Sequence, residues 1–167
     1  MKTAIIEERM VNLRELRFEF EALLTDYVEC LDEGRLEEWP EFFSERGVYK
    51  IIGRENVEQG LPLATMFCDS RAMMKDRVTA VRNALFYSPR YLRHLTGNLK
   101  IVGQEGDAWM AQANYVVFQT LQDEETKVFN AGKYIDKIVL EGGKYRFKEK
   151  IVVYDTIQIP SLIVIPI

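Results

Sequence analysis

The sequence predicts an α+β domain, a cone in which N-terminal helices pack against the concave face of a strongly curved antiparallel sheet. Two observations lead to this fold class. Apolar residues recur at helical spacing within residues 12–85, whereas residues 90–158 consist of β-rich stretches divided by short polar separators. Helices followed by a run of strands are typical of an α+β domain, and a length of 167 residues fits one such domain over residues 1–167.

The first helix is predicted from a stripe of apolar residues at steps of three and four, with charged residues between them. Gly34 is its expected end. A short helical segment over 36–43 and a strand over 48–52 follow, and a second long helix over 69–85 ends before Pro89. The apolar stripe of the first helix comprises Leu13, Leu16, Phe20, Leu24, Tyr27 and Leu31.

The second half of the chain is predicted to be a β meander. Its separators are polar, contain glycine or acidic residues, and are short enough for hairpins. Strands joined by hairpins pair antiparallel, and we expect their sheet to curve around the amphipathic helices. The strands are expected near 91–103, 108–121, 127–140 and 144–158.

Composition argues against several classes of protein. The net charge is −4, and no cluster of Lys and Arg is long enough to follow a phosphate backbone, so nucleic acid is not an expected partner. The N-terminal residues mix acidic and basic side chains in place of a basic segment followed by an apolar one, so neither a secretion signal nor membrane insertion is expected. We therefore expect a cytoplasmic protein.

The residues that bind metals are scarce. Cys30 and Cys68 lie 38 positions apart without a nearby histidine, so they indicate neither a zinc motif nor a disulfide framework, and we expect both to be buried. His94 is the only histidine. Mononuclear iron and Rieske clusters need at least two histidine ligands in their usual forms, so this chain alone is expected to supply neither site and to bind no cofactor.

The last hairpin is predicted to bury a pair of carboxylates. If Gly142 and Gly143 form a two-residue turn, Asp136 lies opposite Glu149 on the apolar face of both strands. Two opposed carboxylates need a cation or a proton, and Arg93, which shares the parity of apolar residues on its own strand, is the expected cation. Two alternatives stay open: the three residues line a pocket, or a register shifted by one residue leaves both acids in solvent.

Other residues are expected at contacts with a second subunit. The tail over 159–167 holds six aliphatic residues and no charge, so it needs a cover, either its own sheet or a neighbouring subunit. His94 has the opposite parity to Arg93 and is expected on the outer face, away from any pocket chemistry. The candidate interface residues are His94, Arg77, Arg82, Arg90, the outward-facing Val152 and Tyr154, and Ile163 and Ile165 in the tail.

Five segments, taken together in their order and spacing, resemble one protein family. They are LDEGRLEEWPEFF at 31–43, CDSRAMMKDRVTAVR at 68–82, RYLRHLTGN at 90–98, AGKYIDK at 131–137 and YRFKEKIVVYDT at 145–156, followed by an apolar C-terminal segment. The sequence is similar to the small (β) subunits of aromatic-ring-hydroxylating dioxygenases, and among them most similar to the terephthalate and salicylate types.

This resemblance implies a cone of the kind shared by ketosteroid isomerase, scytalone dehydratase and nuclear transport factor. It implies a hexamer of three large and three small subunits, with the small subunits forming a trimeric core. In that family the large (α) subunit carries the Rieske [2Fe–2S] cluster and the mononuclear iron, and the small subunit has a structural role. No catalytic residue is therefore carried over to this sequence.

Two other functions are open to a cone with these residues. One is a self-sufficient isomerase, dehydratase or cyclase that uses Asp136, Glu149 or Asp26 as a general base and Tyr27 or Tyr134 as a proton donor. The other is a small-ligand binding or dimerisation module. Both need an open apolar cavity, whereas a scaffold needs an extensive surface for association.

Overall fold

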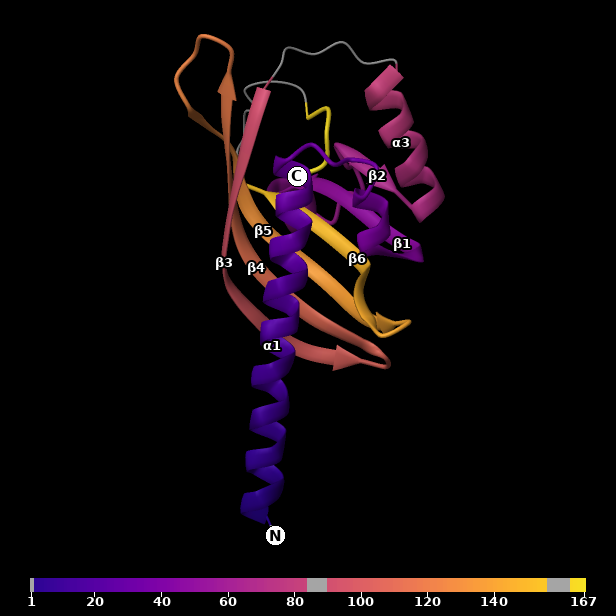
Figure 1. The fold of residues 1–167 in the computed structure, drawn as a ribbon, viewed down its shortest axis with the longest axis vertical. Coiled ribbons are helices and arrows are strands. Elements are labelled where there is room, and N and C mark those ends of the chain that lie inside the picture. Colours follow the sequence, from indigo (N-terminus) through magenta and orange to yellow (C-terminus); the bar gives the residue numbers. More distant parts are fainter. Residues whose placement is uncertain (1, 84–89, 156–162) are drawn as a thin grey trace.

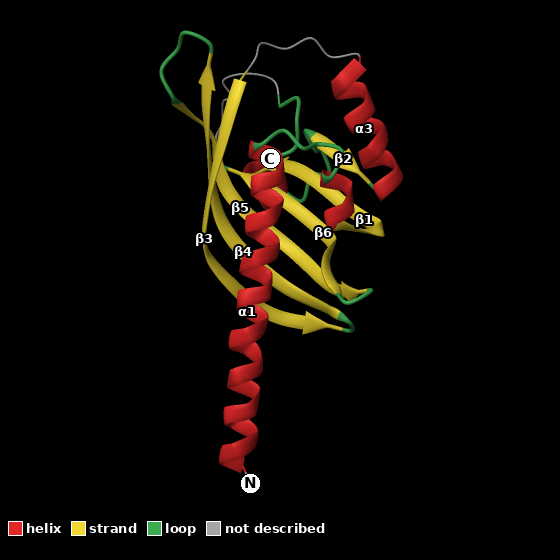
Figure 2. Ribbon diagram, viewed as in Figure 1, coloured by secondary structure: helices red, strands yellow, loops and turns green. Residues whose placement is uncertain are grey.

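The fold was obtained as a computed structural model that describes residues 2–83, 90–155 and 163–167, with side chains from residue 12 onward. One long helix lies against the concave face of a curved six-stranded sheet, and shorter helices lie at one end of the sheet (Figure 1, Figure 2). The elements are α1 (Lys2–Asp32), the 3₁₀ helix η1 (Trp39–Phe42), β1 (Phe43–Gly53), α2 (Arg54–Glu58), β2 (Met66–Cys68), α3 (Arg71–Asn83), β3 (Arg90–Glu105), β4 (Ala108–Leu121), β5 (Lys127–Glu141) and β6 (Lys144–Tyr154).

The strand order in the sheet is β2-β1-β6-β5-β4-β3. Strands β3 to β6 form the predicted antiparallel meander, and Gly142 and Gly143 have positive φ values, as a two-residue turn between β5 and β6 requires. Strand β1 pairs with β6 in parallel, which the sequence did not indicate, and β2 pairs with β1 antiparallel. The parallel pairing is possible because the chain between β1 and β6 is long enough to return in the same direction.

Helix α1 is held by the residues of its predicted apolar stripe. Leu16, Phe20, Leu24, Tyr27 and Leu31 are buried, while Leu13 is exposed. The helix begins at Lys2, ten residues before the predicted helical region, and its N-terminal part projects beyond the sheet (Figure 1). It ends at Asp32, two residues before the predicted Gly34, whose φ of +68° suits a left-handed cap in which Arg35 N–H bonds Cys30 O.

The other predicted helices are present with altered bounds. The segment expected over 36–43 forms the single turn η1, with Pro40 in its first turn, where a missing N–H has no effect. Helix α3 buries Met74, Val78 and Val81 in place of Met73, which is exposed. Leu85 and the expected end of the last strand at 156–158 lie outside the described residues.

Two of the register shifts in the sheet decide which of the predicted site residues point inward. Strand β3 shifts register between Gly97 and Lys100, where Asn98 has a φ of 56°. On the β5–β6 pair the register shifts between Lys137 and Ile138, because Lys148 is an extra residue in β6. A bulge of this kind inverts the inward and outward positions of every residue beyond it.

The sheet also contains one very close backbone approach, at Gly132 on β5. A β-carbon added there would overlap the backbone carbonyl oxygen of Val153 on β6. At Gly97 an added β-carbon would meet none of the described atoms within 4 Å. The pairing of β5 with β6 therefore requires glycine at position 132, whereas β3 has space for a side chain at position 97.

The substitution Gly132→Ala is expected to lower the free energy of unfolding by about 1–3 kcal/mol, because the methyl group forces the two backbones apart. Denaturant unfolding of the variant beside the wild-type protein measures the difference. Gly97→Ala, which also adds one methyl group to a strand glycine, should change the stability by less than about 1 kcal/mol. Equal losses in both variants would contradict this view of the β5–β6 pairing.

Candidate functional site

The interior of the cone contains a buried ion pair between β5 and β6. Lys150 Nζ lies 3.1 Å from Asp136 Oδ2 and 3.2 Å from Oδ1, and the side chains are 0% and 2% exposed. They meet because the extra residue Lys148 shifts the register so that Asp136 pairs with Lys150 in place of Glu149. A charged lysine in this position must be neutralised, and Asp136 supplies the opposite charge.

Aromatic rings enclose the ammonium group of this pair. Lys150 Nζ lies 3.7 Å from the ring centroid of Tyr134, 4.5 Å from that of Phe147 and 4.7 Å from that of Tyr27. These distances are typical of cation–π contacts. Burial raises the pKa of Asp136 and lowers the pKa of Lys150, while the attraction between the two charges opposes both shifts.

The structure corrects the predicted network of Arg93, Asp136 and Glu149. Of the three, only Asp136 belongs to the buried pair. Glu149 is half-exposed and pairs in register with Lys137, while the Arg93 side chain is 64% exposed and lies 3.1 Å from Glu33. The bulges at Asn98 and Lys148 explain the error, because alternation was extrapolated through both of them. The alternative of a register shifted by one residue is correct in the shift itself. It is wrong in placing both acids in solvent, because Asp136 is buried.

His94 points into the cone, contrary to its predicted outward direction. Its Nδ1 lies 2.6 Å from Asp32 Oδ1, and its backbone N–H donates to Asp32 Oδ2 at 2.9 Å. The imidazole is fully buried, and its Nε2 has no hydrogen-bond partner among the described residues. Asp32 thereby joins the C-terminal end of α1 to β3, which is an edge strand of the sheet.

The described end of the tail packs inside its own domain. Tyr27 and Tyr49 both donate their hydroxyls to the carbonyl oxygen of Ile167, at 3.1 and 2.8 Å, and Ile167 N–H donates to Tyr49 Oη. Burial raises the pKa of both tyrosines, so they remain hydroxyl donors at neutral pH. Of the two covers considered for the tail, residues 163–167 use their own cone, while 159–162 lie outside the described residues.

Within residues 12–83, 90–155 and 163–167, the side chains that could bind a metal are scattered. His94 is the only imidazole in the sequence, and Asp32 already engages its Nδ1. Among the described residues, no group of three or more His, Cys, Asp or Glu side chains is placed to hold a metal ion. Asp26, considered as a general base, is exposed outside the cone, and the Tyr27 hydroxyl is bonded to Ile167. In the described part of the chain, His94 and Tyr27 therefore act as hydrogen-bonding groups within the fold.

Comparison with known proteins identifies the family. The family profile of the SnoaL-like domain matches residues 14–150. The small subunit of anthranilate 1,2-dioxygenase from Burkholderia cepacia is 40% identical over 150 residues, which cover 90% of this chain and 93% of that protein. This chain belongs to the small subunits of aromatic-ring-hydroxylating dioxygenases.

Further relatives of the small subunit belong to the same family. The β1 subunit of the terminal oxygenase component of terephthalate 1,2-dioxygenase from Comamonas is 34% identical, covering 84% of this chain and 92% of that protein. A crystal structure assigned as an aromatic-ring-hydroxylating dioxygenase β subunit from Novosphingobium aromaticivorans superposes with a TM-score of 0.83 at 43% identity, covering 91% and 96% of the two chains. The resemblance predicted from the sequence is confirmed.

The cone fold is confirmed as well. A structure assigned as a scytalone dehydratase, also from Novosphingobium aromaticivorans, superposes with a TM-score of 0.67, covering 87% of each chain. Its sequence identity is only 19%, so this likeness concerns the fold alone. None of the described helices of the small subunit is both long and apolar enough to cross a membrane.

Several predicted interface residues of the small subunit are occupied by contacts within the chain. Arg77 donates to the Val164 carbonyl, and Arg82 bonds Glu37 and the Gly34 carbonyl. Arg90 is half-exposed, and the hydroxyl of the half-exposed Tyr154 bonds Thr65.

The apolar interface candidates are largely buried within the chain. Val152 was predicted to face outward but is fully buried, because the bulge at Lys148 turns it inward. Ile163 is buried by its own domain, and Ile165 is partly buried against the core.

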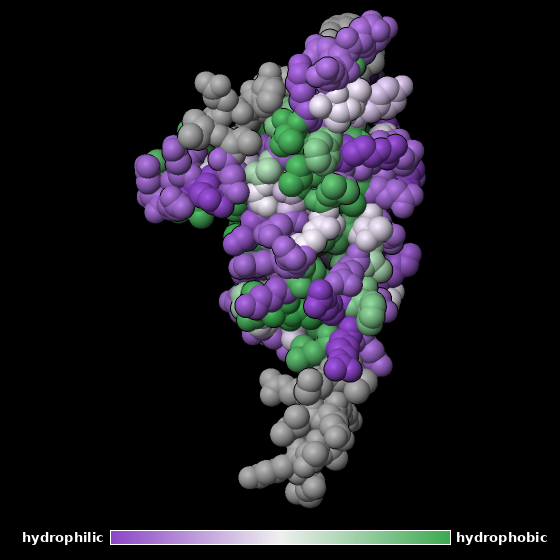
Figure 3. Space-filling view, turned by 90° about the vertical axis from the view of Figure 1, so that its left-hand side faces the viewer, coloured by the Kyte–Doolittle hydropathy of each residue, from purple (hydrophilic) through white to green (hydrophobic). Residues whose placement is uncertain are grey.

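Sequence reasoning missed an apolar surface on the outside of the sheet. Tyr91 and Leu95 of β3 are 76% and 63% exposed, and Val128 of β5 is 52% exposed. Leu95 pairs with Val116, and Phe118 with Val128, so all five side chains share the outer side of β3, β4 and β5. We call these five residues the outer apolar face. On the side of the molecule that carries β3, hydrophobic side chains lie among hydrophilic ones (Figure 3).

The signal for this surface was present in the sequence but was assigned to the wrong side. Tyr91 and Leu95 were counted as inward because they share the parity of Leu99, which is buried. The bulge at Asn98 separates them, so the same parity means opposite faces before and after it. Lys150 was missed in the same way. It alternates with apolar residues along β6, as Arg146 and Lys148 do, so it was expected to face outward.

Replacement of the buried cation tests the ion pair. Lys150→Met is expected to lower the free energy of unfolding by about 3–5 kcal/mol at pH 8, because it leaves the Asp136 carboxylate buried and unpaired. The double variant Asp136→Leu/Lys150→Met should recover most of this loss, since neither charge remains. A double variant no more stable than Lys150→Met would count against a charge-pair origin of the effect.

The loss in free energy of unfolding caused by Lys150→Met should become smaller as the pH falls from 8 to 5. Burial already raises the pKa of Asp136 in the folded protein, and loss of the ammonium raises it further. Above the unfolded pKa of about 3.9 the folded variant then binds more protons than the unfolded chain, so its stability rises as the pH is lowered. Denaturant unfolding at several pH values measures this, and a deficit independent of pH would contradict it.

Proposed function

We propose that the chain is the non-catalytic structural β subunit of a Rieske non-heme iron ring-hydroxylating dioxygenase that acts in the degradation of aromatic compounds. The observation that carries this proposal is the 40% identity to a dioxygenase small subunit over 90% of the chain. The interior supports it, because the only histidine is used to join α1 to β3. The Rieske [2Fe–2S] cluster and the mononuclear iron then belong to the large subunit.

The partner in this proposal is the large (α) subunit, in a hexamer of three large and three small chains with the small subunits forming a trimeric core. Closed symmetric assemblies of this kind need self-complementary or matching surfaces on each copy. The outer apolar face supports such contacts, since large apolar side chains exposed side by side are typical of protein interfaces. The cytoplasmic location is supported by two buried cysteines that are both free thiols.

Co-expression with the large subunit tests the proposal directly. Native mass spectrometry should give a complex with three copies of each chain, and metal analysis should find iron in the complex. The small subunit purified alone should bind no iron in stoichiometric amount. Failure of the two chains to associate, or stoichiometric iron in the isolated small subunit, would overturn the proposed function.

Leu95→Glu is expected to weaken assembly at least about tenfold, because it places a charge among the exposed side chains of the outer apolar face. Leu63→Glu is the matched control, since Leu63 is similarly exposed at 73% and lies outside this face. Analytical ultracentrifugation of both variants measures assembly, and circular dichroism checks the fold. Full assembly of Leu95→Glu would remove the outer apolar face from the proposed interface.

A further inference from the structure

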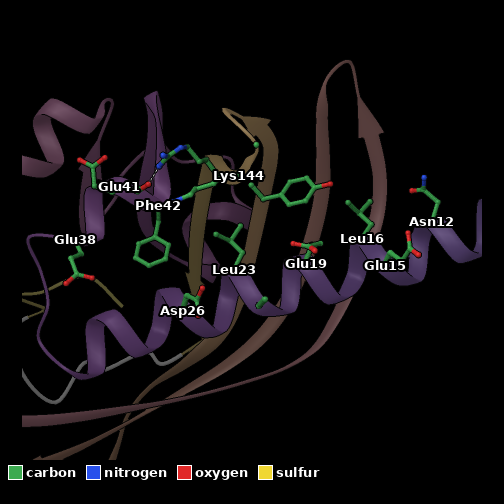
Figure 4. A pocket seen from close by; sticks show the side chains of 14 residues that line it. Asn12, Glu15, Leu16, Glu19, Leu23, Asp26, Glu38, Glu41, Phe42 and Lys144 are labelled. Atoms are coloured by element: carbon green, nitrogen blue, oxygen red, sulfur yellow. Dashed lines mark hydrogen bonds between the residues drawn. The ribbon is translucent and has the colours of Figure 1, made fainter.

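A groove of about 840 Å³ lies between α1 and the β5–β6 hairpin. Helix α1 forms one wall, the hairpin residues 143–146 form the other, and η1 closes one end (Figure 4). Phe20 of α1 touches the Tyr145 ring edge to face at 5.2 Å between centroids, which fixes the distance between the two walls. The groove is therefore part of the fold and lies outside the filled cone.

The floor of the groove is apolar. Leu16, Leu23, Phe42 and Tyr145 line it, and the last three remain half-exposed. Partly exposed apolar side chains in a concave surface release free energy when a partner covers them, by about 25 cal/mol for each Å² removed from water. The floor thus favours a ligand with apolar side chains of its own.

The rim of the groove is acidic. Five carboxylates line the groove against two cations, Lys144 and Arg146. Glu41 and Glu38 at the η1 end are already paired, with Lys75 and with Arg35. The remaining three carboxylates, Glu15, Glu19 and Asp26, are exposed and form no ion pair with any other described residue.

The unpaired carboxylates follow one face of α1. Glu15 and Glu19 are four residues apart, a spacing at which like charges destabilise a helix, and Asp26 lies two turns further along (Figure 4). The row extends over about 16 Å at a rise of 1.5 Å per residue, the length of about three helical turns. A partner segment with several Lys or Arg side chains would neutralise this row.

We propose that this groove binds a basic amphipathic segment of the large subunit, with apolar side chains on the floor and Lys or Arg side chains along the α1 wall. This inference rests on the proposed function and names the contact that serves it. The net charge of −4 on this chain makes a second copy a poorer occupant than a partner rich in Lys and Arg. The groove and the outer apolar face are made of different residues, so one chain can use both at once.

Charge reversal in the groove tests the proposal against a matched control. The double variant Glu15→Lys/Glu19→Lys should bind the purified large subunit at least tenfold more weakly than wild type at low salt. Added salt should weaken the wild-type complex and reduce the difference in affinity between wild type and this double variant. The double variant Asp76→Lys/Glu125→Lys changes the charge equally, at exposed positions outside the groove, and should stay within twofold of wild type.

A photo-crosslinking amino acid at the exposed Ala22, in the groove wall, provides a second readout that does not depend on affinity. Mass spectrometry should find crosslinks to a large-subunit segment that contains Lys or Arg among apolar residues. Crosslinks to another copy of this chain, crosslinks to an acidic segment, or no crosslink within an intact complex would overturn the proposal.

The binding results separate the two proposals. If wild type binds the large subunit and both double variants bind equally well, the groove is excluded as the contact while the proposed function stands. If wild type itself does not associate with the large subunit, the proposed function fails and the groove proposal fails with it.

Discussion

The pairing of Lys150 with Asp136 is the buried interaction that constrains how β5 and β6 align inside the cone. Each group is buried in a low-dielectric interior and is costly there alone, and the observed register of β5 and β6 joins the two. That register requires the extra residue Lys148, which then turns Val152 inward.

The same interior determines where the chain can act. The rings of Tyr27, Tyr134 and Phe147 surround the ammonium group of the ion pair. The Tyr27 hydroxyl donates a hydrogen bond to the carbonyl oxygen of Ile167. His94 is fixed by Asp32. The described part of the cone is thus occupied by its own side chains, whereas large apolar and acidic groups are exposed on the outside. A small subunit built in this way acts through its surfaces.

The sequence was sufficient to predict features that depend on local periodicity. The stripe of α1 apart from Leu13, the hairpin at Gly142 and Gly143, and the order of the predicted elements were correct, whereas α2 and β2 were not predicted. Side-chain direction in β3 and β6 was wrong, because a bulge is a single-residue event that leaves regular alternation on both sides of it. Arg93 and His94 exchanged faces for this reason. The parallel pairing of β1 with β6 was also missed, since nothing local encodes a contact between distant strands.

The small subunit is proposed to take no part in the chemistry. The decisive measurement is turnover by the assembled dioxygenase after His94, the only histidine in the small subunit, has been replaced. A complex carrying His94→Gln, once assembled, is expected to retain its iron content and to turn over substrate within twofold of wild type per iron. A loss of tenfold or more, with assembly and iron content unchanged, would contradict this proposal, because the small subunit would then take part in the chemistry.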